Sequence, residues 1–570
     1  MCAAVAVALV VPALAGAARQ TLLPGVTYER TVVLKGGRPV VLHIVRTPPQ
    51  GGLYRLRPVL SHGNVLGRQA VPEMQSRLRG TATTVGVNGD FFRLATGESS
   101  GLYLRDGVVS SPSAAKRSAL AIGADGRLAI EMFRLVGSWR AGTSGARPLR
   151  NFNRKVTTPS GVALFTPRRG GLTPRARGAV EVVLTGFPPA RIGADLTGTV
   201  AAVTRGGRTP IPRGGAVLQA SGDIRDTLLA AAPVGTTVTI RLRFAAFPDG
   251  ALDAIGGGPL LVRDGAPVRR PGEGFTFDQL DRRHPRTAVG QLADGSYLFV
   301  VADGRSRRSA GLTTWRLAQT MADLGAVTAL NFDGGGSSTL SFDGRVLNTP
   351  SDGVPRRVAN GLFLFYYGIY APPLASGVLS PNGDGVGESK ELSARVVRRA
   401  AVRLRLVRPD GSEAWRLEDV VGRGRISRAV SDADMPDGTW RWIAEATDEA
   451  TGEKSRMVRQ FKVNKTLGHL RLSRAPVRVR PPTAGRLDIS VRLTRSARLT
   501  VAVLGTDGKV RRTVFAGEAA PGTKRWRWNA RTGSGRVAPP GSYVVRVTAR
   551  NEIGAVSLRR PVRVLLAPSR

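Results

Sequence analysis

Residues 331–338 combine one carboxylate, three consecutive glycines and two hydroxyl groups, directly after the apolar run 327–330. Glycines have no Cβ atom, so backbone N–H groups in such a loop can approach a ligand closely. Three glycines also lose much backbone freedom on folding, which is costly for packing alone. The pattern indicates a strand that ends in a ligand site, and a glycine-rich hairpin turn with a surface Asp is the alternative. The candidate residues of this loop are Asp333, Gly334, Gly335, Gly336, Ser337 and Ser338.

A second carboxylate follows the preceding apolar segment. Residues 295–302 are rich in β-branched and aromatic side chains, and Asp303 comes directly after them. Residues 313–324 have the caps and apolar spacing of a helix. If the strands at 295–302 and 327–332 are parallel neighbours joined by a right-handed crossover, Asp303 and Asp333 emerge at the same edge of one sheet. For Asp303, an ordinary turn residue is the alternative.

A third polar loop at 88–92, Asn-Gly-Asp-Phe-Phe, follows the apolar run 83–87. Asn88 and Asp90 are candidates to line a site, and a hairpin with two core phenylalanines is the alternative. Hard divalent cations take oxygen ligands, so Asp90, Asp303 and Asp333 could in principle bind such an ion together. No compact Asp-rich loop with a recognised spacing supports such a site, and we expect neither a metal nor a cofactor.

Six motifs within residues 80–366 resemble, in order, those of the phosphodiester glycosidases. One departure concerns the last motif, where the family often has a Glu-Arg pair and this chain has Pro355-Arg356. Either that Glu is not essential to the chemistry, or the activity of this chain is altered or lost. The motifs lie at 87–92, 254–261, 284–290, 303–305, 331–338 and 356–360.

The resemblance implies hydrolysis of a sugar linked through its anomeric oxygen to a phosphate that bears a second substituent. Glycoside cleavage needs a carboxylate near the anomeric carbon. Phosphate leaves readily, so a positive clamp matters more than a strong acid. We assign Asp333 as nucleophile or base, Asp303 as its partner, and Arg286 to the phosphate. His284 is a candidate proton donor, with a structural hydrogen bond as the alternative. The candidate substrate-binding residues are Asn88, Asp90, Arg305, Gly334, Gly335, Gly336, Ser337, Ser338 and Arg356.

The first 18 residues form an apolar stretch closed by small residues, which is typical of a secretory signal peptide, although a basic start is missing. A membrane anchor is the alternative. Cys2 is the only cysteine and lies inside this stretch, so a mature chain would have no thiol. Cysteine catalysis and zinc-finger chemistry are thereby excluded.

The net charge of +43 raises the question of nucleic-acid binding. Only nine of the 84 basic residues are Lys, and Arg is spread through every region of the chain. No nucleic-acid-binding motif accompanies the charge, so we expect no specific nucleic acid as partner and no membrane partner after signal cleavage. A phosphodiester-linked carbohydrate or another anionic polymer of the cell envelope is the expected partner.

Residues after 370 have a different pattern. Alternating apolar residues at 402–406 and 499–503 each lead into an Asp-Gly turn, and each is followed by a pair of tryptophans, at 440/442 and 526/528. This repeat predicts two β-sandwich modules, 371–465 and 466–570. The second is similar to the immunoglobulin-like module of the flagellar hook-capping protein.

The sequence thus predicts an α+β catalytic domain at 19–370, after a signal peptide at 1–18, followed by two all-β immunoglobulin-like sandwich domains. The predicted protein is a bacterial glycosidase, secreted or associated with the cell surface, that hydrolyses glycosyl phosphodiesters on cell-wall or exopolysaccharide polymers. The alternative is a catalytically degraded surface protein that binds polysaccharide or serves adhesion.

Overall fold

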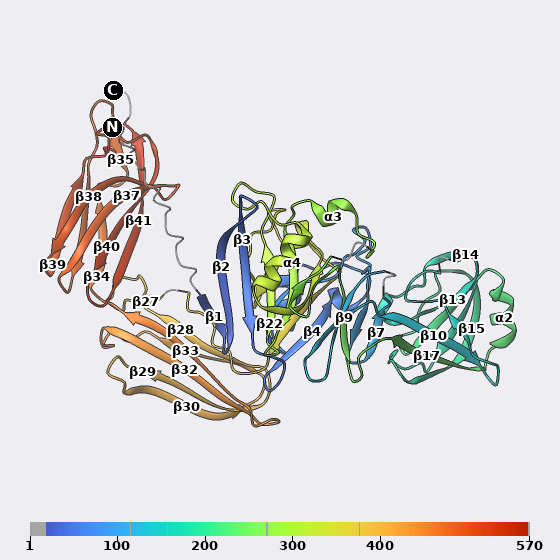
Figure 1. Ribbon diagram of the computed structural model, residues 1–570. Helices are drawn as coiled ribbons and strands as arrows, with labels where there is room; N and C mark the ends of the chain where they lie inside the picture. Colours follow the sequence, from blue (N-terminus) through green and yellow to red (C-terminus); the bar gives the residue numbers. More distant parts are fainter. Residues whose placement is uncertain (1–18, 114–115, 157, 270–271, 376, 568–570) are drawn as a thin grey trace, which may run out of the picture. The chain divides into compact units, whose positions relative to one another are not determined.

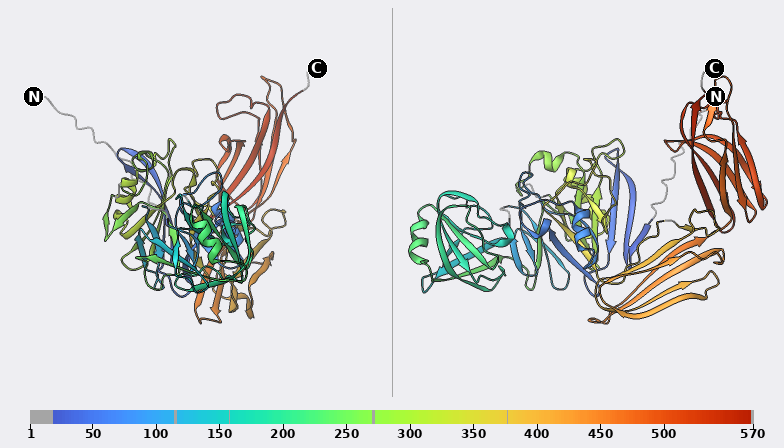
Figure 2. Two further views of the ribbon diagram at one scale, coloured as in Figure 1. Left: turned by 90° about the vertical axis from the view of Figure 1, so that its right-hand side faces the viewer. Right: turned by 180° about the vertical axis from the view of Figure 1, so that it is seen from behind.

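The computed structural model describes residues 19–113, 116–156, 158–269, 272–375 and 377–567. The predicted signal peptide lies outside these residues. The chain divides into two compact units, Met1–Tyr367 and Gly368–Arg570. Strands dominate the fold, as Figures 1 and 2 show. The amino-terminal unit was predicted to be an α+β domain, but its helical content is small because its helices are short. They are α1 (Val71–Leu78), α2 (Ile224–Ala231), α3 (Phe277–Asp281) and α4 (Thr314–Asp323).

The first sheet of the amino-terminal unit positions two of the predicted aspartates. Its strand order differs from the expectation in one respect: β21 lies between β22 and β23 and is antiparallel to both. The strands that precede Asp303 and Asp333 are therefore parallel to each other but are not neighbours. In spatial order the sheet comprises β1 (Arg19–Leu23), β2 (Val26–Lys35), β3 (Arg38–Thr47), β22 (Tyr297–Ala302), β21 (Arg286–Leu292), β23 (Ala326–Phe332), β19 (Leu260–Arg263) and β20 (Ala266–Pro267).

Helix α4 connects β22 to β23 and confirms the helix predicted over 313–324. Thr313 caps it by accepting a hydrogen bond from the Arg316 N–H at 3.1 Å. Leu317 and Met321 are buried in a cluster with Val300, which lies on the neighbouring sheet. Burial of this apolar face stabilises the helix and fixes where β23 begins.

Two five-stranded sheets complete the part of the unit that carries the site. Helix α1 packs on the first of them through Val71 and Met74. That sheet has the order β25 (Arg345–Val346), β24 (Leu340–Phe342), β5 (Thr83–Asn88), β26 (Asn360–Tyr366), β4 (Tyr54–Leu60). The second has the order β7 (Val108–Ser111), β6 (Tyr103–Arg105), β18 (Asp253–Gly256), β8 (Ala119–Ile122), β9 (Leu128–Glu131).

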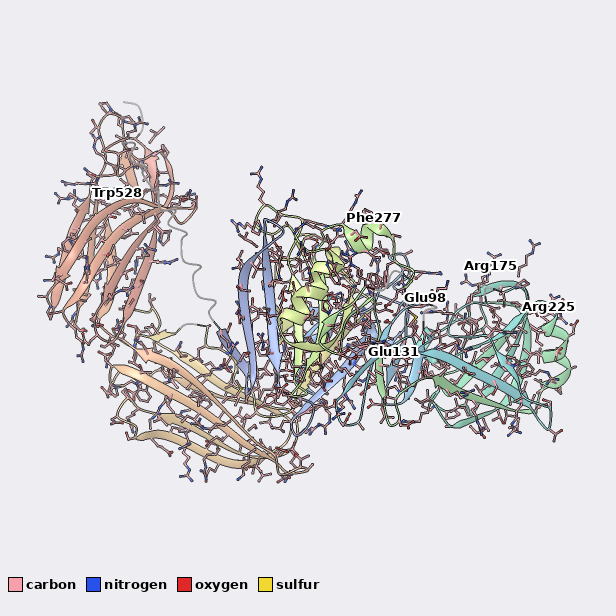
Figure 3. All side chains as sticks on the ribbon, viewed as in Figure 1. Glu98, Glu131, Arg175, Arg225, Phe277 and Trp528 are labelled. Carbon is pink, nitrogen blue, oxygen red and sulfur yellow. The ribbon has the colours of Figure 1, made fainter. Side chains whose placement is uncertain are left out.

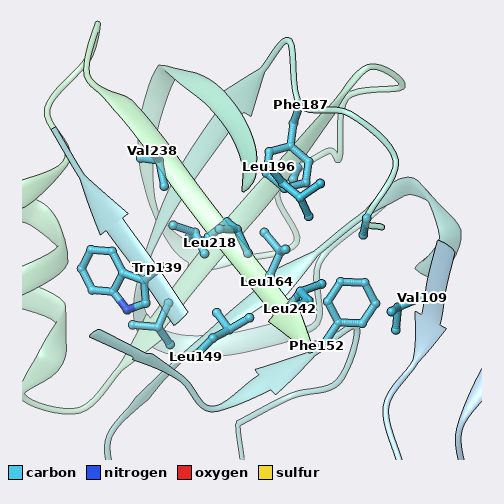
Figure 4. Packing of buried hydrophobic residues seen from close by; sticks show 14 of the residues in the cluster. Val109, Trp139, Leu149, Phe152, Leu164, Phe187, Leu196, Leu218, Val238 and Leu242 are labelled. Carbon is cyan, nitrogen blue, oxygen red and sulfur yellow. The ribbon is translucent and has the colours of Figure 1, made fainter. Parts of the chain in front are cut away.

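An eight-stranded sheet between residues 134 and 245 was not predicted from the sequence. Its core contains Trp139, Phe152 and Leu164, seen in Figure 4. Helix α2 belongs to the same region. The spatial order is β11 (Arg147–Leu149), β10 (Arg134–Ala141), β17 (Thr237–Ala245), β15 (Asp195–Gly207), β14 (Arg175–Thr185), β16 (Gly215–Ser221), β13 (Gly161–Phe165), β12 (Asn151–Phe152). Short 3₁₀ turns lie at η1 (Ser61–Gly63), η2 (Pro167–Arg169) and η3 (Gly335–Ser337).

The described residues of the carboxy-terminal unit are all-β, and both predicted hairpins are present, as β29–β30 and β37–β38. Trp442 and Trp528 are buried. The sheets of the first region are β27 (Val378–Leu379), β33 (Lys454–Val463), β32 (Gly438–Asp448), β29 (Ala400–Val407), β30 (Glu413–Val421), and β28 (Lys390–Val396) with β31 (Gly424–Val430). Those of the second are β34 (Leu467–Ser473), β36 (Leu487–Leu493), β39 (Gly522–Trp528), and β35 (Val477–Val479), β41 (Ala555–Leu566), β40 (Gly541–Arg550), β37 (Ala497–Gly505), β38 (Val510–Ala519). No helix in the described part of the chain has the length and apolar character needed to span a bilayer.

Candidate active site

The ends of strands from two different sheets meet at Asp333. The Asp333 N–H donates to the Gly89 carbonyl at 3.0 Å, and the Asn88 side chain donates to the Asp333 carbonyl at 2.7 Å. The Asn88 side-chain oxygen in turn accepts from the Thr287 hydroxyl at 2.9 Å and from the Thr339 N–H at 3.0 Å. Asn88 was predicted to bind substrate, but its amide is used to join the two sheets and to position Asp333.

The Asp333 carboxyl group is partly exposed, although protein atoms surround it densely. This burial raises its pKa to about 6; the Ser337 hydroxyl and Arg356 oppose the rise, while Asp90 adds to it. A carboxyl with such a pKa is ionised at neutral pH yet poorly solvated, which suits a nucleophile or a general base.

Asp90 is the carboxylate that the structure pairs with Asp333. It is 1% exposed, and its pKa is raised to about 6 by burial, against hydrogen bonds from Ser99 and Gly101. The Ser99 hydroxyl donates to Oδ2 at 2.9 Å, and the Gly101 N–H donates to the same atom. Its Oδ1 has no hydrogen-bond partner among the described residues. A Cβ atom on Gly256 would lie 2.8 Å from Oδ2, so this glycine makes room for the carboxylate.

Asp303 lies at the same sheet edge as Asp333 but has other partners. It is 5% exposed, and its Oδ2 lies 3.1 Å from His43 Nε2. Its Oδ1 accepts from the Thr349 N–H at 3.0 Å. One strand separates β22 from β23, so the backbones at the two strand ends are about 10 Å apart. The Asp303 carboxylate thus anchors the loop around residue 349, and its pairing with Asp333 stays a prediction.

Arg286 also lies at this edge, but its guanidinium is occupied. It donates to three carbonyl groups, those of Leu312 at 2.9 Å, Gln279 at 2.7 Å and Arg282 at 2.9 Å. The side chain is almost fully buried, and burial lowers its pKa to about 10. Arg286 therefore ties α3 and the segment before α4 to the sheet, and its assignment to the phosphate stays a prediction.

His284 and Arg305 form a contact beside the glycine loop. Arg305 Nη2 lies 3.1 Å from His284 Nδ1, and His284 Nε2 lies 3.1 Å from the Asp278 carbonyl. Burial, Arg286 and Arg305 lower the pKa of His284, so the imidazole is neutral at pH 7. A neutral ring that accepts from Arg305 orients that guanidinium, and it is a poor proton donor.

The three consecutive glycines bring two arginines onto the loop backbone. A Cβ atom on Gly335 would lie 3.0 Å from Arg305 Nη2, and one on Gly336 would lie 2.1 Å from Arg356 Nη2. The Gly335 N–H is not free to bind a ligand, because it donates a hydrogen bond to the Pro285 carbonyl at 2.9 Å. The glycines therefore make room for cations as well as for a ligand.

The hydroxyl-bearing end of the loop is buried. Ser337 lies close enough to Asp333 to lower its pKa, although its hydroxyl makes no hydrogen bond of regular geometry among the described residues; its role in binding stays a prediction. The Ser338 hydroxyl is buried without a hydrogen-bond partner in the described part of the chain. In the same part of the chain, no group of three or more His, Cys, Asp or Glu is arranged to hold a metal ion.

Comparison with known families agrees with this geometry. The family model of the phosphodiester glycosidases matches residues 190–365, which include both β23 and the glycine loop. The resemblance to the phosphodiester glycosidases is confirmed. A second model, that of the FlgD Ig-like domain, matches residues 480–552. The immunoglobulin-like assignment of the first carboxy-terminal region stays a prediction.

Several proteins are similar to parts of this chain. The SPbeta prophage-derived uncharacterized protein YomE of Bacillus subtilis is 37% identical over 117 residues, 20% of this chain and 18% of the relative. The mouse N-acetylglucosamine-1-phosphodiester alpha-N-acetylglucosaminidase is 39% identical over 67 residues, 12% of this chain and 13% of that enzyme. The chain thus spans less than a fifth of each of these relatives. A crystal structure of a hypothetical Synechocystis protein shares the fold, with a TM-score of 0.53, 23% identity, and coverage of 60% of this chain and 62% of that one.

The departure from the phosphodiester glycosidase pattern at Pro355 is accompanied by a different carboxylate. Asp352 Oδ2 accepts from Arg356 Nε at 3.0 Å and from Arg356 Nη2 at 2.7 Å. The same oxygen would lie 2.1 Å from a Cβ atom on Gly336. Asp352 therefore lies on the glycine loop. Sequence reasoning missed it, because residues 352–356 form an irregular segment in which spacing does not predict contact.

Three further residues lie at this glycosidase-like site. Phe91 belongs to the polar loop at 88–92, whereas Phe275 and Arg117 lie in none of the motifs found in the sequence. The rings of Phe91 and Phe275 are 5.2 Å apart, and the Arg117 guanidinium lies 5.1 Å from the first centroid and 4.6 Å from the second. Arg117 also lowers the pKa of Asp90. These residues form a half-buried aromatic and cationic wall next to the paired carboxylates.

Proposed function

We propose that this protein hydrolyses glycosyl phosphodiesters at Asp333. The observation that carries the proposal is the pair of carboxyl groups, Asp333 and Asp90, whose pKa values burial raises to about 6. Asp333 is followed directly by a glycine loop that two arginines border. Paired carboxyl groups suit glycoside cleavage, and the arginines suit a phosphate leaving group.

In the proposed reaction, water cleaves the bond between the anomeric carbon and the phosphate oxygen. The products are the free sugar and a phosphomonoester. Asp333 is the nucleophile or the base that activates water, because it is the partly exposed member of the pair. Arg305 and Arg356 stabilise the negative charge that develops on the leaving phosphate. The wall of Phe91, Phe275 and Arg117 contacts the sugar ring or the second substituent.

We further propose that the protein is exported and acts on phosphodiester-linked polymers of the cell envelope, with two immunoglobulin-like modules as spacers or binders. The apolar, small-residue sequence of the first 18 residues and the net charge of +43 support this proposal.

The test is release of reducing sugar from a panel of glycosyl phosphodiesters, including one of N-acetylglucosamine and a wall-polymer fragment. Asp333→Asn should lower turnover by at least about 10³-fold without loss of fold. Asp323→Asn, at an exposed carboxylate of α4, serves as control and should behave as the wild type. Polymer binding without turnover in the wild type would instead support the surface-binding alternative, and would make Pro355→Glu the next variant.

A further inference from the structure

Three arginines from three different elements converge on residues 58–63. Arg77 of α1 donates to the Leu60 carbonyl at 2.8 Å, Arg105 of β6 to the Pro58 carbonyl at 3.3 Å, and Arg168 of η2 to the Gly63 carbonyl at 3.1 Å. With Tyr103, Ser110 and Asp106 they line a cavity of about 270 Å³, called here the arginine cavity. Each guanidinium carries five N–H donors, so the single carbonyl contacts of Arg77 and Arg168 leave other donors for a ligand. Arg105 is also held by Asp106 and by the ring of Phe365.

The positive charge of the arginine cavity is only partly neutralised within the protein. Asp106 is the carboxylate that lines it, and that group already pairs with Arg57 at 2.6 Å and with Arg105 at 3.6 Å. Neither Arg77 nor Arg168 forms an ion pair with a carboxylate among the described residues. The pKa of Arg77 is lowered, first by burial and also by the charge of Arg105. A cavity with this excess of oriented cations favours an anion with several oxygen acceptors.

The arginine cavity lies at the same sheet edge as the candidate active site. Strand β26 pairs with β4, with Asn360 opposite Leu60, and it also pairs with β5, with Gly361 opposite Asn88. Strands β4 and β5 are therefore parallel, and both end at this edge. Two strand spacings separate Leu60 from Asn88, which is about 10 Å. That separation equals the length of about three residues of a fully extended chain.

We propose that the arginine cavity is a second anion subsite, which binds a further phosphodiester group of the polymer whose glycosyl bond is cleaved at Asp333. This inference rests on the proposed function, and it narrows the substrate from a small glycosyl phosphodiester to a chain with repeated phosphodiester groups. The arginine cavity distinguishes the small substrate from the polymer, because only the polymer has a second phosphodiester group to place in it. Because guanidinium donors match phosphate oxygens in pairs, Lys replaces Arg only in part.

The experiment compares a six-unit N-acetylglucosamine 1-phosphate polymer with the methyl phosphodiester of N-acetylglucosamine 1-phosphate, using the full chain. Arg168→Gln and Arg77→Gln should raise the KM for the polymer at least fivefold, with kcat within twofold, and the rise should be several times smaller for the small substrate. Arg168→Lys should restore part of the loss. Arg175→Gln serves as matched control; Arg175 is an exposed arginine, labelled in Figure 3, that does not line the cavity.

Direct binding separates this proposal from the proposed function. In calorimetric titrations, the wild type should bind the polymer at least fivefold more tightly than either Gln variant, whether or not it is cleaved. Equal binding by wild type and both variants overturns the subsite, even if hydrolysis is found. Competition by inorganic phosphate alone, with no difference between variants on the polymer, also overturns it. Absence of turnover on every substrate, with the binding difference present, leaves the subsite supported and rejects the hydrolase.

Discussion

At the scale of single residues, the chemistry depends on two carboxyl groups that cannot both be well solvated. Asp90 is nearly inaccessible and Asp333 is partly exposed, and each pKa is raised to about 6 mainly by burial. The charge of Asp90 makes a smaller contribution to the raised pKa of Asp333 than burial does. In the proposed reaction, the partly exposed Asp333 contacts the substrate, and the charge of the buried Asp90 adds to the rise in the pKa of Asp333.

This pairing predicts the pH dependence of the reaction. If Asp333 acts in its ionised form, kcat/KM should rise with pH through about 6 and then level off. In Asp90→Asn, which removes the neighbouring charge, the midpoint should move to lower pH. The measurement is a pH–rate profile from pH 4 to 8 for both proteins. A midpoint near 4 in the wild type would contradict the raised pKa.

The same burial predicts a stability effect. The folded state holds the Asp90 proton up to about pH 6, whereas an unfolded Asp releases it near its ordinary pKa of about 3.9. The folded chain therefore binds more protons in this window, and stability falls as pH rises through it. Relative to Asp90→Asn, the wild type should lose up to about 3 kcal/mol between pH 3.5 and 7. Thermal unfolding across this range measures the difference; a pH-independent difference would argue against a buried, ionising carboxyl.

At the scale of elements, the glycines of the loop after β23 have no side chains, so charged side chains from other segments can lie against the loop backbone. Arg305, Arg356 and Asp352 all lie against Gly335 and Gly336. The residues predicted for this loop from the sequence are the residues that form it, because steric freedom of glycine is a local property. Strand order is not local, so the sequence did not reveal that β21 lies between β22 and β23, the strands that precede Asp303 and Asp333.

Gly336→Ala tests the role of this loop. Its Cβ would lie 2.1 Å from both Arg356 Nη2 and Asp352 Oδ2, and these are the ends of flexible side chains that can move aside. We expect stability to change by less than about 1 kcal/mol and kcat/KM to fall at least about tenfold. Gly214→Ala is the matched control, since nothing lies within 4 Å of its added Cβ. An unchanged kcat/KM would show that Arg356 and Asp352 do not take part.

At the scale of the whole molecule, the chain consists of two compact units, and the boundary between them in the sequence lies after residue 367. Each has its own buried core, so each is expected to unfold on its own. Calorimetry of the full chain should show at least two transitions, and Asp333→Asn should leave the transition of residues 368–570 unchanged. A single cooperative transition would contradict independent units.

The sequence by itself determined the features that arise from local rules: strands with alternating apolar residues, the capped helix at Thr313, the Asp-Gly hairpins, and the glycine loop around Asp333. These depend on backbone sterics and on short-range periodicity. Only the tertiary structure decided which charged groups meet. Asp90 lies near Asp333, His43 contacts Asp303, and the guanidinium of Arg286 donates to backbone carbonyls. Such pairings depend on strand order and on the burial of groups that are far apart in the chain, and no local pattern encodes either.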